Sequence, residues 1–316
     1  MTAQPTSTET TDPHQTYKAI GLMVLATVCF ALLDTTVKFL VDTKGVPTSQ
    51  ATWLRFAGHV VFSALVLWPF ALRPSLRSAK PFFQILRSCL MITTTALNFI
   101  ALKYLQLDQT ITIFFMTPLL VAGLAGPLLG EWVGWHRFLA IVAGFFGVLV
   151  VMHPGFGEVH WAMLLVLGAT FGYALYNIAT RYLAGFDPAS VTQTYTPLVG
   201  VAVMAPFAFS DWLWPDDWRL WVVFATLGLW GGLGHWLLIL AHRAAPAAVL
   251  APYIYMGLIW MSVGGFLVFG DVPTGWTLGG GGIVILAGLY LLARERRAMA
   301  KQGVAKGGAA AQVGPQ

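Results

Sequence analysis

Apolar residues dominate ten long stretches of the chain, and polar or turn-forming residues separate them. A helix needs about 20 mainly apolar residues to cross the hydrocarbon core of a bilayer. Each stretch is close to this length, and Pro47, Pro215 and Pro273 mark three of the connections. The pattern predicts an all-α membrane protein with ten transmembrane helices, near residues 18–40, 53–72, 82–102, 110–129, 136–152, 160–182, 191–209, 219–241, 248–269 and 276–293.

Lysine and arginine residues are distributed unevenly between the two ends of these predicted helices. Cytoplasmic ends of membrane proteins carry an excess of Lys and Arg. With a cytoplasmic N-terminus, the inner side carries 13 of these cations and the outer side 5, so we expect both termini in the cytoplasm. The inner residues are Lys18, Arg73, Arg77, Lys80, Arg87, Arg137, Arg181, Arg243, Arg294, Arg296, Arg297, Lys301 and Lys306, and the outer ones are Lys38, Lys44, Arg55, Lys103 and Arg219.

The second half of the chain echoes the first at an offset near 140 residues. The segment ALKYLQLDQTITIFFM, from Ala101, aligns with AHRAAPAAVLAPYIYM, from Ala241. We therefore expect two five-helix repeats, residues 17–152 and 159–293. Because each repeat has an odd number of helices, the two must be inverted relative to the membrane, an arrangement that recurs in secondary transporters.

The composition supports a membrane environment. Hydrophobic residues make up 57% of the chain and charged residues 10%, whereas a soluble domain carries about 25% charged residues. The net charge of +5 does not indicate a nucleic-acid partner, because the cations lie at helix ends. Cys29 and Cys89 fall within apolar runs and provide neither a disulfide framework nor a zinc site, so no metal or cofactor is expected. Residues 1–16 and the basic segment 294–316 are expected to be disordered cytoplasmic tails.

Several motifs occur along the predicted helices. The first half contains FALLDTTVKFL, the start Trp53-Leu54-Arg55-Phe56 of the second helix, ALKYL and GVLVVMHPG. The second half contains GHWLLILAHRAAPAAVLAP and VFGDVPTGWTLGGGGIVILAGLYLL. With these motifs the chain resembles, over roughly residues 17–293, the EamA-like branch of the drug/metabolite transporter superfamily. The resemblance implies ten spans, alternating access and a small organic metabolite as cargo. Members carry amino acids, S-adenosylmethionine, riboflavin, sugars or drugs, so the solute stays open, and Asp271 stands where many relatives carry Glu.

The first two predicted helices carry charged residues within their apolar stretches, namely Asp34, Lys38 and Arg55. An ionised side chain at the bilayer centre costs roughly 2.5–3.5 kcal/mol, so such residues usually face a cavity or a partner. Asp34 and Lys38 are four residues apart on one helix and are expected to pair. Arg55, at the same outer depth, is expected to join them. The group is interpreted either as an outer gate or coupling site, or as a structural ion pair that anchors the helices near the interface.

Other charged residues, glycines and prolines receive structural interpretations. Glu131 and Asp271 each follow a glycine and are interpreted as helix stops at the water interface. Arg87 is interpreted as an anchor at the inner side. The glycines of the eighth and tenth predicted helices are expected to let neighbouring helices approach closely. Pro118, Pro197 and Pro252 lie within predicted helices and are expected either to kink them or to be tolerated by packing alone.

Polar and aromatic residues deeper in the predicted helices are candidates for a substrate cavity. Asn98 and His235 are expected to face a common cavity, because inverted repeats bring the third and eighth helices opposite each other. A packed core in which each bonds a neighbour is the alternative, since either group is costly to bury unpaired. Aromatic rings are expected to stack on a planar or cationic group, or simply to pack. The expected pathway residues are Asp34, Lys38, Arg55, Asn98, Asn177, Gln193, Tyr195, His235, Tyr253, Tyr255 and Trp260.

These features favour a secondary transporter of a small organic solute in a bacterial-type inner membrane. Uptake, export, proton coupling and a homodimer are left open, and the expected partners are the solute and the lipid bilayer. A membrane-embedded enzyme is the alternative, but the histidines show no clustering in the sequence and no catalytic residues are expected. A channel or a non-transporting membrane subunit is the third interpretation. Inverted repeats favour alternating access over a symmetric pore.

Overall fold

The computed structural model describes residues 13–67, 77–129, 135–152, 160–183, 185–245, 250 and 253–312. Within these residues the chain is helical and contains no β-strand, which confirms the all-α class. The helices in chain order are α1 (Pro13–Lys38), the short π-helix η1 (Phe39–Thr43), α2 (Thr48–Leu67), α3 (Pro81–Leu102), α4 (Leu107–Phe114), α5 (Thr117–Leu129), α6 (Trp135–Met152), α7 (Ala162–Leu183), α8 (Ala189–Ser210), α9 (Trp218–Ala244), α11 (Gly257–Phe269) and α12 (Gly275–Gln312).

The described helices have the length and surface of membrane spans. Six segments are long and apolar enough to cross a membrane, namely Tyr17–Thr43, Pro81–Leu102, Leu107–Leu124, Ala162–Leu183, Trp218–His242 and Gly275–Arg294. Two shorter apolar helices, Phe138–Met152 and Gly257–Phe269, lie among them. Large apolar side chains such as Leu65, Leu164 and Leu286 are exposed on the outside of the bundle. Apolar surface on this scale is suited to lipid and not to water, so the chain forms a multi-pass membrane bundle.

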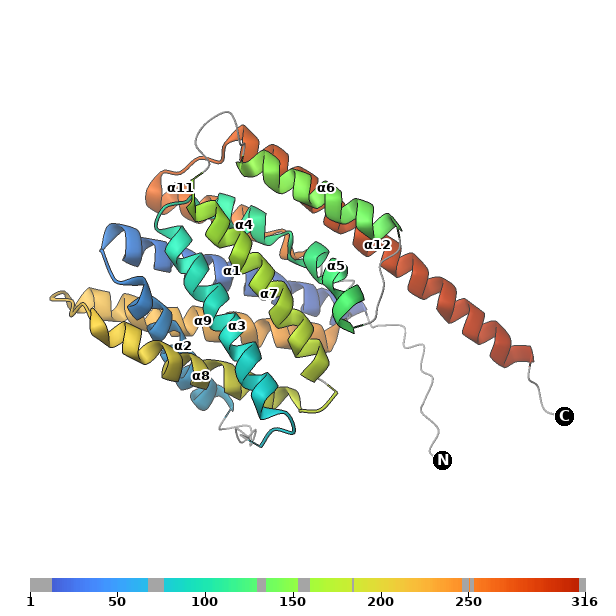
Figure 1. Ribbon diagram of the computed structural model, residues 1–316, viewed down its shortest axis with the longest axis horizontal. Helices are drawn as coiled ribbons and strands as arrows, with labels where there is room; N and C mark the ends of the chain where they lie inside the picture. The colour runs from blue at the N-terminus through green and yellow to red at the C-terminus, as the bar shows by residue number, and fades with distance from the viewer. Residues whose placement is uncertain are drawn as a thin grey trace.

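Helices from the two halves of the chain lie against one another. α1 packs mainly on α9 and α11, α2 on α8 and α9, and α3 on α7 and α8. α6 and α12 run side by side along one edge of the bundle (Figure 1). Because these contacts all join an early helix to a late one, both halves build the centre of the bundle.

Glycines permit the closest of these contacts. A Cβ atom added at Gly58 of α2 would lie 2.5 Å from Gly228 Cα of α9. A Cβ added at Gly147 of α6 would lie 2.8 Å from the carbonyl oxygen of Gly280 in α12. Only a residue without a side chain fits at such distances, which is how small residues bring membrane helices together. The interpretation of the glycines as close-approach positions is therefore confirmed at Gly228 and Gly280.

Two helices are interrupted within the bundle. α4 ends at Phe114 and α5 begins at Thr117, with a turn at residues 115–116 between them. Pro118 has no N–H group to carry the helical hydrogen bonds across this turn, which confirms the expected kink. α8 continues without interruption through Pro197, and Pro252 lies outside the described residues. A second turn, at residues 255–256, precedes α11. The two interruptions bend the chain at matching places in its first and second halves.

The structure revises the expectation for the basic tail and extends the first helix. α12 continues to Gln312, so residues 294–312 are helical and not the disordered tail expected for 294–316. Ala, Arg, Lys and Gln are abundant there and are strong helix formers. α1 likewise begins at Pro13, within the segment expected to be disordered.

The expected helix stop after α11 is present. Gly270 ends α11 with φ of +74°, the left-handed conformation that glycine adopts most readily at a helix end. Glu131, the corresponding residue of the first half, lies outside the described residues.

Candidate functional site

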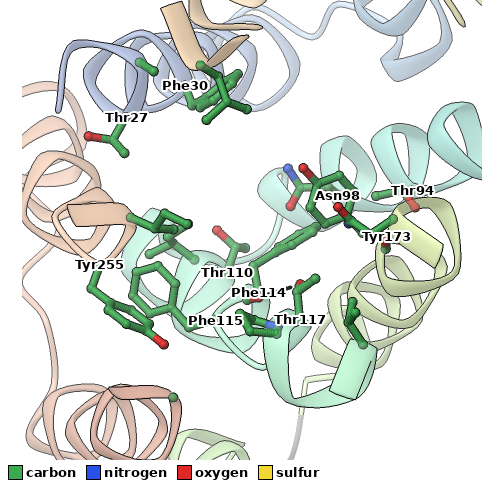
Figure 2. A pocket seen from close by; sticks show the side chains of 18 of the residues that line it. Thr27, Phe30, Thr94, Asn98, Thr110, Phe114, Phe115, Thr117, Tyr173 and Tyr255 are labelled. Atoms are coloured by element: carbon green, nitrogen blue, oxygen red, sulfur yellow. Dashed lines mark hydrogen bonds between the residues drawn. The ribbon is translucent and has the colours of Figure 1, made fainter. Parts of the chain in front are cut away.

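A cavity of about 1030 Å³ occupies the centre of the bundle (Figure 2). Its lining comes from both halves of the chain, chiefly from α1, α3, α4, α7, α9, α12 and the segment around Tyr255. Asp34 and Arg55 lie at its deep limit. Arg181 and His242, from the last turns of α7 and α9, line its other limit. The cavity therefore runs from the middle of the bundle toward the end at which α7 and α9 finish.

Asp34, Arg55 and Asn98 form a polar cluster at the deep limit. Arg55 Nη1 donates to Thr95 Oγ1 at 2.8 Å, and Asn98 Nδ2 lies 3.5 Å from Asp34 Oδ2, the acceptor. Arg55 is 5% exposed, and Asp34 is the carboxylate whose charge acts on it. Arg55 Nε and Asn98 Oδ1 are buried without a hydrogen-bond partner among the described residues. Buried polar atoms of this kind are costly unless something bonds them, so they are suited to the polar groups of a ligand.

Aromatic rings form the walls beside this cluster. The Phe114 and Tyr173 rings lie 6.3 Å apart in an edge-to-face arrangement, and Phe115 meets Tyr255 at 4.9 Å. Figure 2 shows these four rings on one side of the space and Phe30 of α1 on the other. Aromatic faces stack on planar rings and attract cations. The cavity therefore combines a charged, amide-bearing end with aromatic walls.

His59 of α2 and His235 of α9 stack on each other near the polar cluster. Their rings stack with centroids 5.6 Å apart and an interplanar angle of 13°, and Phe30 contacts His235 edge-on at 5.1 Å. His235 lines the cavity, as expected, together with Asn98. The two histidines are far apart in the sequence, and their spacing does not reveal this contact. In the part of the chain that the structure describes, no carboxylate is hydrogen-bonded to either ring, so the pair lacks the geometry of a catalytic triad.

Lys38 does not pair with Asp34, and this expectation is corrected. Its Nζ donates to Asp271 Oδ2 and to the carbonyl oxygen of Leu105, both at 2.9 Å. The ammonium also lies 4.8 Å from the centre of the Phe269 ring. The long lysine side chain reaches past the end of α1 to the α11–α12 connection, where a carboxylate and a carbonyl together satisfy it better than a neighbour on its own helix would.

Arg87 is a buried link between helices and not the interfacial anchor expected from its position. It is 1% exposed and donates to Thr180 Oγ1, Thr192 O and Thr196 Oγ1. Its guanidinium lies 4.8 Å from the centre of the Tyr176 ring. It thereby joins α3 to α7 and α8.

Asp187, between α7 and α8, forms a second link to α3. It accepts hydrogen bonds from Ser78 Oγ, the Ala79 N–H at 2.7 Å and Gln84 Nε2 at 2.8 Å. Burial alone would raise the pKa of Asp187, but the hydrogen bonds from Ser78, Gln84 and Ala79 outweigh it and lower that pKa. The connection between α7 and α8 is therefore tied to the start of α3.

The structure brings most, but not all, of the expected pathway residues to the cavity. Gln193 and Tyr195 lie on α8, which contributes no described residue to the lining. Tyr253 and Trp260 pack against apolar core clusters instead. The expected residues that do line the cavity are Asp34, Arg55, Asn98, Asn177, His235 and Tyr255.

Several lining residues were missed by the sequence analysis. They are chiefly on the broken α4–α5 helix, where Thr110, Phe114, Phe115 and Thr117 face the cavity. The sequence signal that could have found them is Pro118, because interrupted membrane helices place irregular backbone where it lines a cavity.

The chain is similar to known proteins over most of its length. A family model described as the EamA-like transporter family matches residues 17–153 and again residues 160–294. A riboflavin transporter of Vibrio cholerae is 26% identical over 285 residues, which cover 90% of this chain and 96% of that protein. An S-adenosylmethionine uptake transporter of Rickettsia bellii is 28% identical over 295 residues, covering 92% and 99%.

More distant similarities agree with these. A pseudopaline exporter of Pseudomonas aeruginosa is 23% identical over 273 residues, covering 85% of this chain and 94% of that protein. One solved crystal structure aligns with a TM-score of 0.62 over 90% of this chain and 98% of its own, at 15% identity. That likeness shows a shared fold alone.

Proposed function

This chain belongs to the EamA-like transporter family, and from that premise we propose that it transports a small organic metabolite with a planar ring and polar substituents, which binds in the central cavity. It is a transporter and not an enzyme, in keeping with relatives named for riboflavin and S-adenosylmethionine transport. The observation that carries the proposed substrate class is the cavity itself. Its aromatic walls at Phe114 and Tyr173 stand beside the polar groups of Asp34, Arg55 and Asn98.

The size of the cavity supports a solute of this class. Ligand cavities span about 300–1,000 Å³, and a volume near 1030 Å³ lies at the upper end of that range. A flavin or an adenine-bearing solute needs both a flat apolar surface and partners for several polar groups. An aliphatic amino acid would leave most of the aromatic wall uncovered. Relatives named for uptake and for export are both similar to this chain, so we propose no direction of transport.

The proposed architecture is ten spans in two inverted five-helix repeats, residues 17–152 and 159–293. It is supported by the interruptions at 115–116 and 255–256, which are 140 residues apart and therefore match the sequence offset. Phe115 and Tyr255, one at each interruption, touch within the cavity. Discontinuous helices in corresponding positions of two inverted halves, meeting at the substrate site, are typical of secondary transporters.

The proposed orientation has both termini in the cytoplasm of a bacterial-type inner membrane. α1 begins and α12 ends at the same end of the bundle (Figure 1). The lysine and arginine asymmetry supports a cytoplasmic location for that end. In this orientation the cavity faces inward, and the Lys38–Asp271 pair lies across its outer end.

Transport by the purified protein in proteoliposomes tests the substrate class. We expect riboflavin, S-adenosylmethionine or another ring-bearing solute to exchange across the membrane, and aliphatic amino acids not to compete. Phe114→Ala should raise the apparent KM about two- to tenfold, since one aromatic contact contributes about 0.5–1.5 kcal/mol. Phe146→Ala, on the outer face of α6, is the matched control and should leave the KM unchanged. Competition by aliphatic solutes alone, with Phe114→Ala without effect, would contradict the proposed class.

A further inference from the structure

Basic side chains surround the limit of the central cavity at which α7 and α9 finish, which we call the mouth. Arg181 lies in the last turn of α7, His242 in the last turn of α9 and His136 in the first turn of α6. Arg294 ends the apolar part of α12, Gly275–Arg294. All four side chains line the cavity. Four helices therefore contribute basic groups to the mouth, opposite the polar cluster at the deep limit.

The cavity lining carries more positive than negative charge. Among the described residues it contains three arginines, Arg55, Arg181 and Arg294, and a single carboxylate, Asp34. Because Arg55 and Asp34 share the deep limit, the excess of positive charge lies at the mouth. A guanidinium group is not deprotonated in proteins. Charge of one sign between low-dielectric walls raises the local concentration of counter-ions, so the mouth is suited to an anionic group.

The charge preference of cytoplasmic helix ends does not by itself explain this arrangement. That preference places Lys and Arg at the ends but does not decide which way they face. Arg297, about one turn after Arg294 on α12, is exposed and is not among the described residues of the lining, whereas Arg294 is. On α7, Tyr173, Asn177 and Arg181 follow one another at intervals of four residues and all line the cavity. Arg181 therefore shares the helix face that carries the aromatic wall.

The helix geometry gives the distance between the aromatic walls and the mouth. Arg181 follows Tyr173 by eight residues, a rise of about 12 Å along α7. On α9, His242 follows His235 by seven residues, a rise of about 10 Å. A planar ring between the aromatic walls therefore leaves the mouth within reach of a substituent chain of several atoms. At its end, arginine side chains bind phosphate and carboxylate groups with paired hydrogen bonds.

We propose that the mouth binds an anionic substituent of the solute, a phosphate or carboxylate group, while the ring of the solute lies between the aromatic walls. Arg181 and Arg294 bind the anion. The solute class is then a ring-bearing anion, such as a nucleotide or a flavin phosphate, in preference to its uncharged parent compound. The inference rests on the proposed function, because it makes the planar-ring solute of that proposal more specific.

Charged thiol reagents test the mouth without any solute. Val121→Cys, at a partly exposed lining position of α5, is made in a chain whose Cys29 and Cys89 are replaced by serine. Its reaction rates with an anionic (sulfonatoethyl) and a cationic (trimethylammonioethyl) methanethiosulfonate are each divided by the rate of a free thiol. We expect a preference of about tenfold for the anionic reagent at low ionic strength, and a smaller one in about 0.5 M salt. Leu238→Cys of α9, also in the lining, repeats the measurement, and inertness at both positions would overturn the proposal.

Glutamine variants identify the groups that attract the anion. Arg181→Gln and Arg294→Gln should each lower the anionic preference by about threefold, because each removes one of the two guanidinium charges at the mouth. Arg297→Gln removes the same charge about one turn away but outside the described lining, so it is the matched control and should keep the parental preference. If Arg181→Gln does not fold, Arg294→Gln decides alone. A parent without anionic preference, or a loss in Arg297→Gln as large as that in Arg294→Gln, would overturn the proposal.

Matched pairs of solutes test the preference in binding. Riboflavin is compared with riboflavin 5′-phosphate, and adenosine with adenosine monophosphate, by equilibrium binding to the detergent-purified protein. The phosphorylated member of a bound pair should have a Kd at least about tenfold lower, equivalent to about 1.4 kcal/mol, and Arg294→Gln should remove most of the difference. Equal or tighter binding of the uncharged member would overturn the inference and leave the proposed function standing. Binding of no member of either pair would contradict the proposed solute class, while the cysteine rates would still decide the charge preference of the mouth.

Discussion

A double-mutant cycle on the free energy of unfolding identifies the electrostatic partner of Asp34. The cycle combines Asp34→Asn with Arg55→Met, and a parallel cycle combines Asp34→Asn with Lys38→Met. In the structure the Asp34 carboxylate acts on Arg55, whereas Lys38 turns away to Asp271. The coupling free energy should therefore appear in the first cycle and not in the second.

The magnitude follows from the geometry. Two unit charges 4 Å apart interact by about 4 kcal/mol at an effective dielectric constant near 20. Asp34 and Arg55 are farther apart than the 4.0 Å of an ion pair, and the Asp34 side chain is only half-buried. We therefore expect a coupling of about 2 kcal/mol with Arg55, and less than about 0.5 kcal/mol with Lys38, the range within which independent sites add.

The assay is the free energy of unfolding of the detergent-purified protein, measured by titration with sodium dodecyl sulfate for the parent, the single variants and both double variants. Asp34→Asn alone should destabilise the protein, because it leaves a buried guanidinium without its counter-charge. Arg55→Met in addition should recover most of the loss. A coupling with Lys38 as large as that with Arg55 would refute this reasoning and restore the pair expected from the sequence.

Three further perturbations test the orientation, the helix packing and the Asp187 link. A fluorescent protein fused after Gln316 should fold and fluoresce in a bacterial host, while alkaline phosphatase fused there should be inactive; an active phosphatase would reverse the proposed orientation. Gly58→Ala should lower the free energy of unfolding by about 1–3 kcal/mol, because its Cβ would lie 2.5 Å from the backbone of α9. Gly282→Ala, which meets no atom within 4 Å, is the control and should be neutral or slightly stabilising; equal losses would contradict the packing argument. Because the folded-state pKa of Asp187 is lowered, its hydrogen bonds contribute stability above the ordinary Asp range and lose it as the pH falls through the folded value. Protection of the Ala79 N–H from hydrogen exchange, corrected for intrinsic rates, should therefore fall below about pH 4 in the parent, and Asp187→Asn should abolish this pH dependence; an unchanged dependence in the variant would exclude Asp187 as its source.

The hydrophobic pattern predicted the all-α class and the six described segments that are long and apolar enough to span a membrane, since a helix forms its own hydrogen bonds locally and needs only length and composition. The same holds for Gly228, where the lack of a side chain is itself the signal for close contact. Pro118 marked the break between α4 and α5 because the missing N–H acts at one position. Features of this kind depend on neighbours along the chain, and the sequence displays them.

The errors concern contacts that join distant segments. Lys38 and Asp271 are 233 positions apart, and a local rule favours the nearer Asp34. Arg87 reads as an interfacial cation because it lies near a helix start, and its burial depends on acceptors supplied by Thr180 on α7 and Thr192 on α8. The cavity lining follows the same division. Asn98 was predicted to line the cavity because its polar amide group is costly to bury without a partner. Phe114 was not predicted, because nothing in the sequence distinguishes it from the other phenylalanines.

The reactivity of a single cysteine at Asn98 measures most directly whether the central cavity is the solute site. In a chain whose Cys29 and Cys89 are replaced by serine, Asn98→Cys should react with a small polar methanethiosulfonate reagent, because this position lines the cavity. Thr52→Cys, at a fully buried position outside the cavity lining, is the control and should be inert. The solute identified by the transport assay should slow the reaction at position 98 in proportion to its occupancy. A cysteine at position 98 that stays inert, or that reacts equally fast with saturating solute, would contradict transport through this cavity.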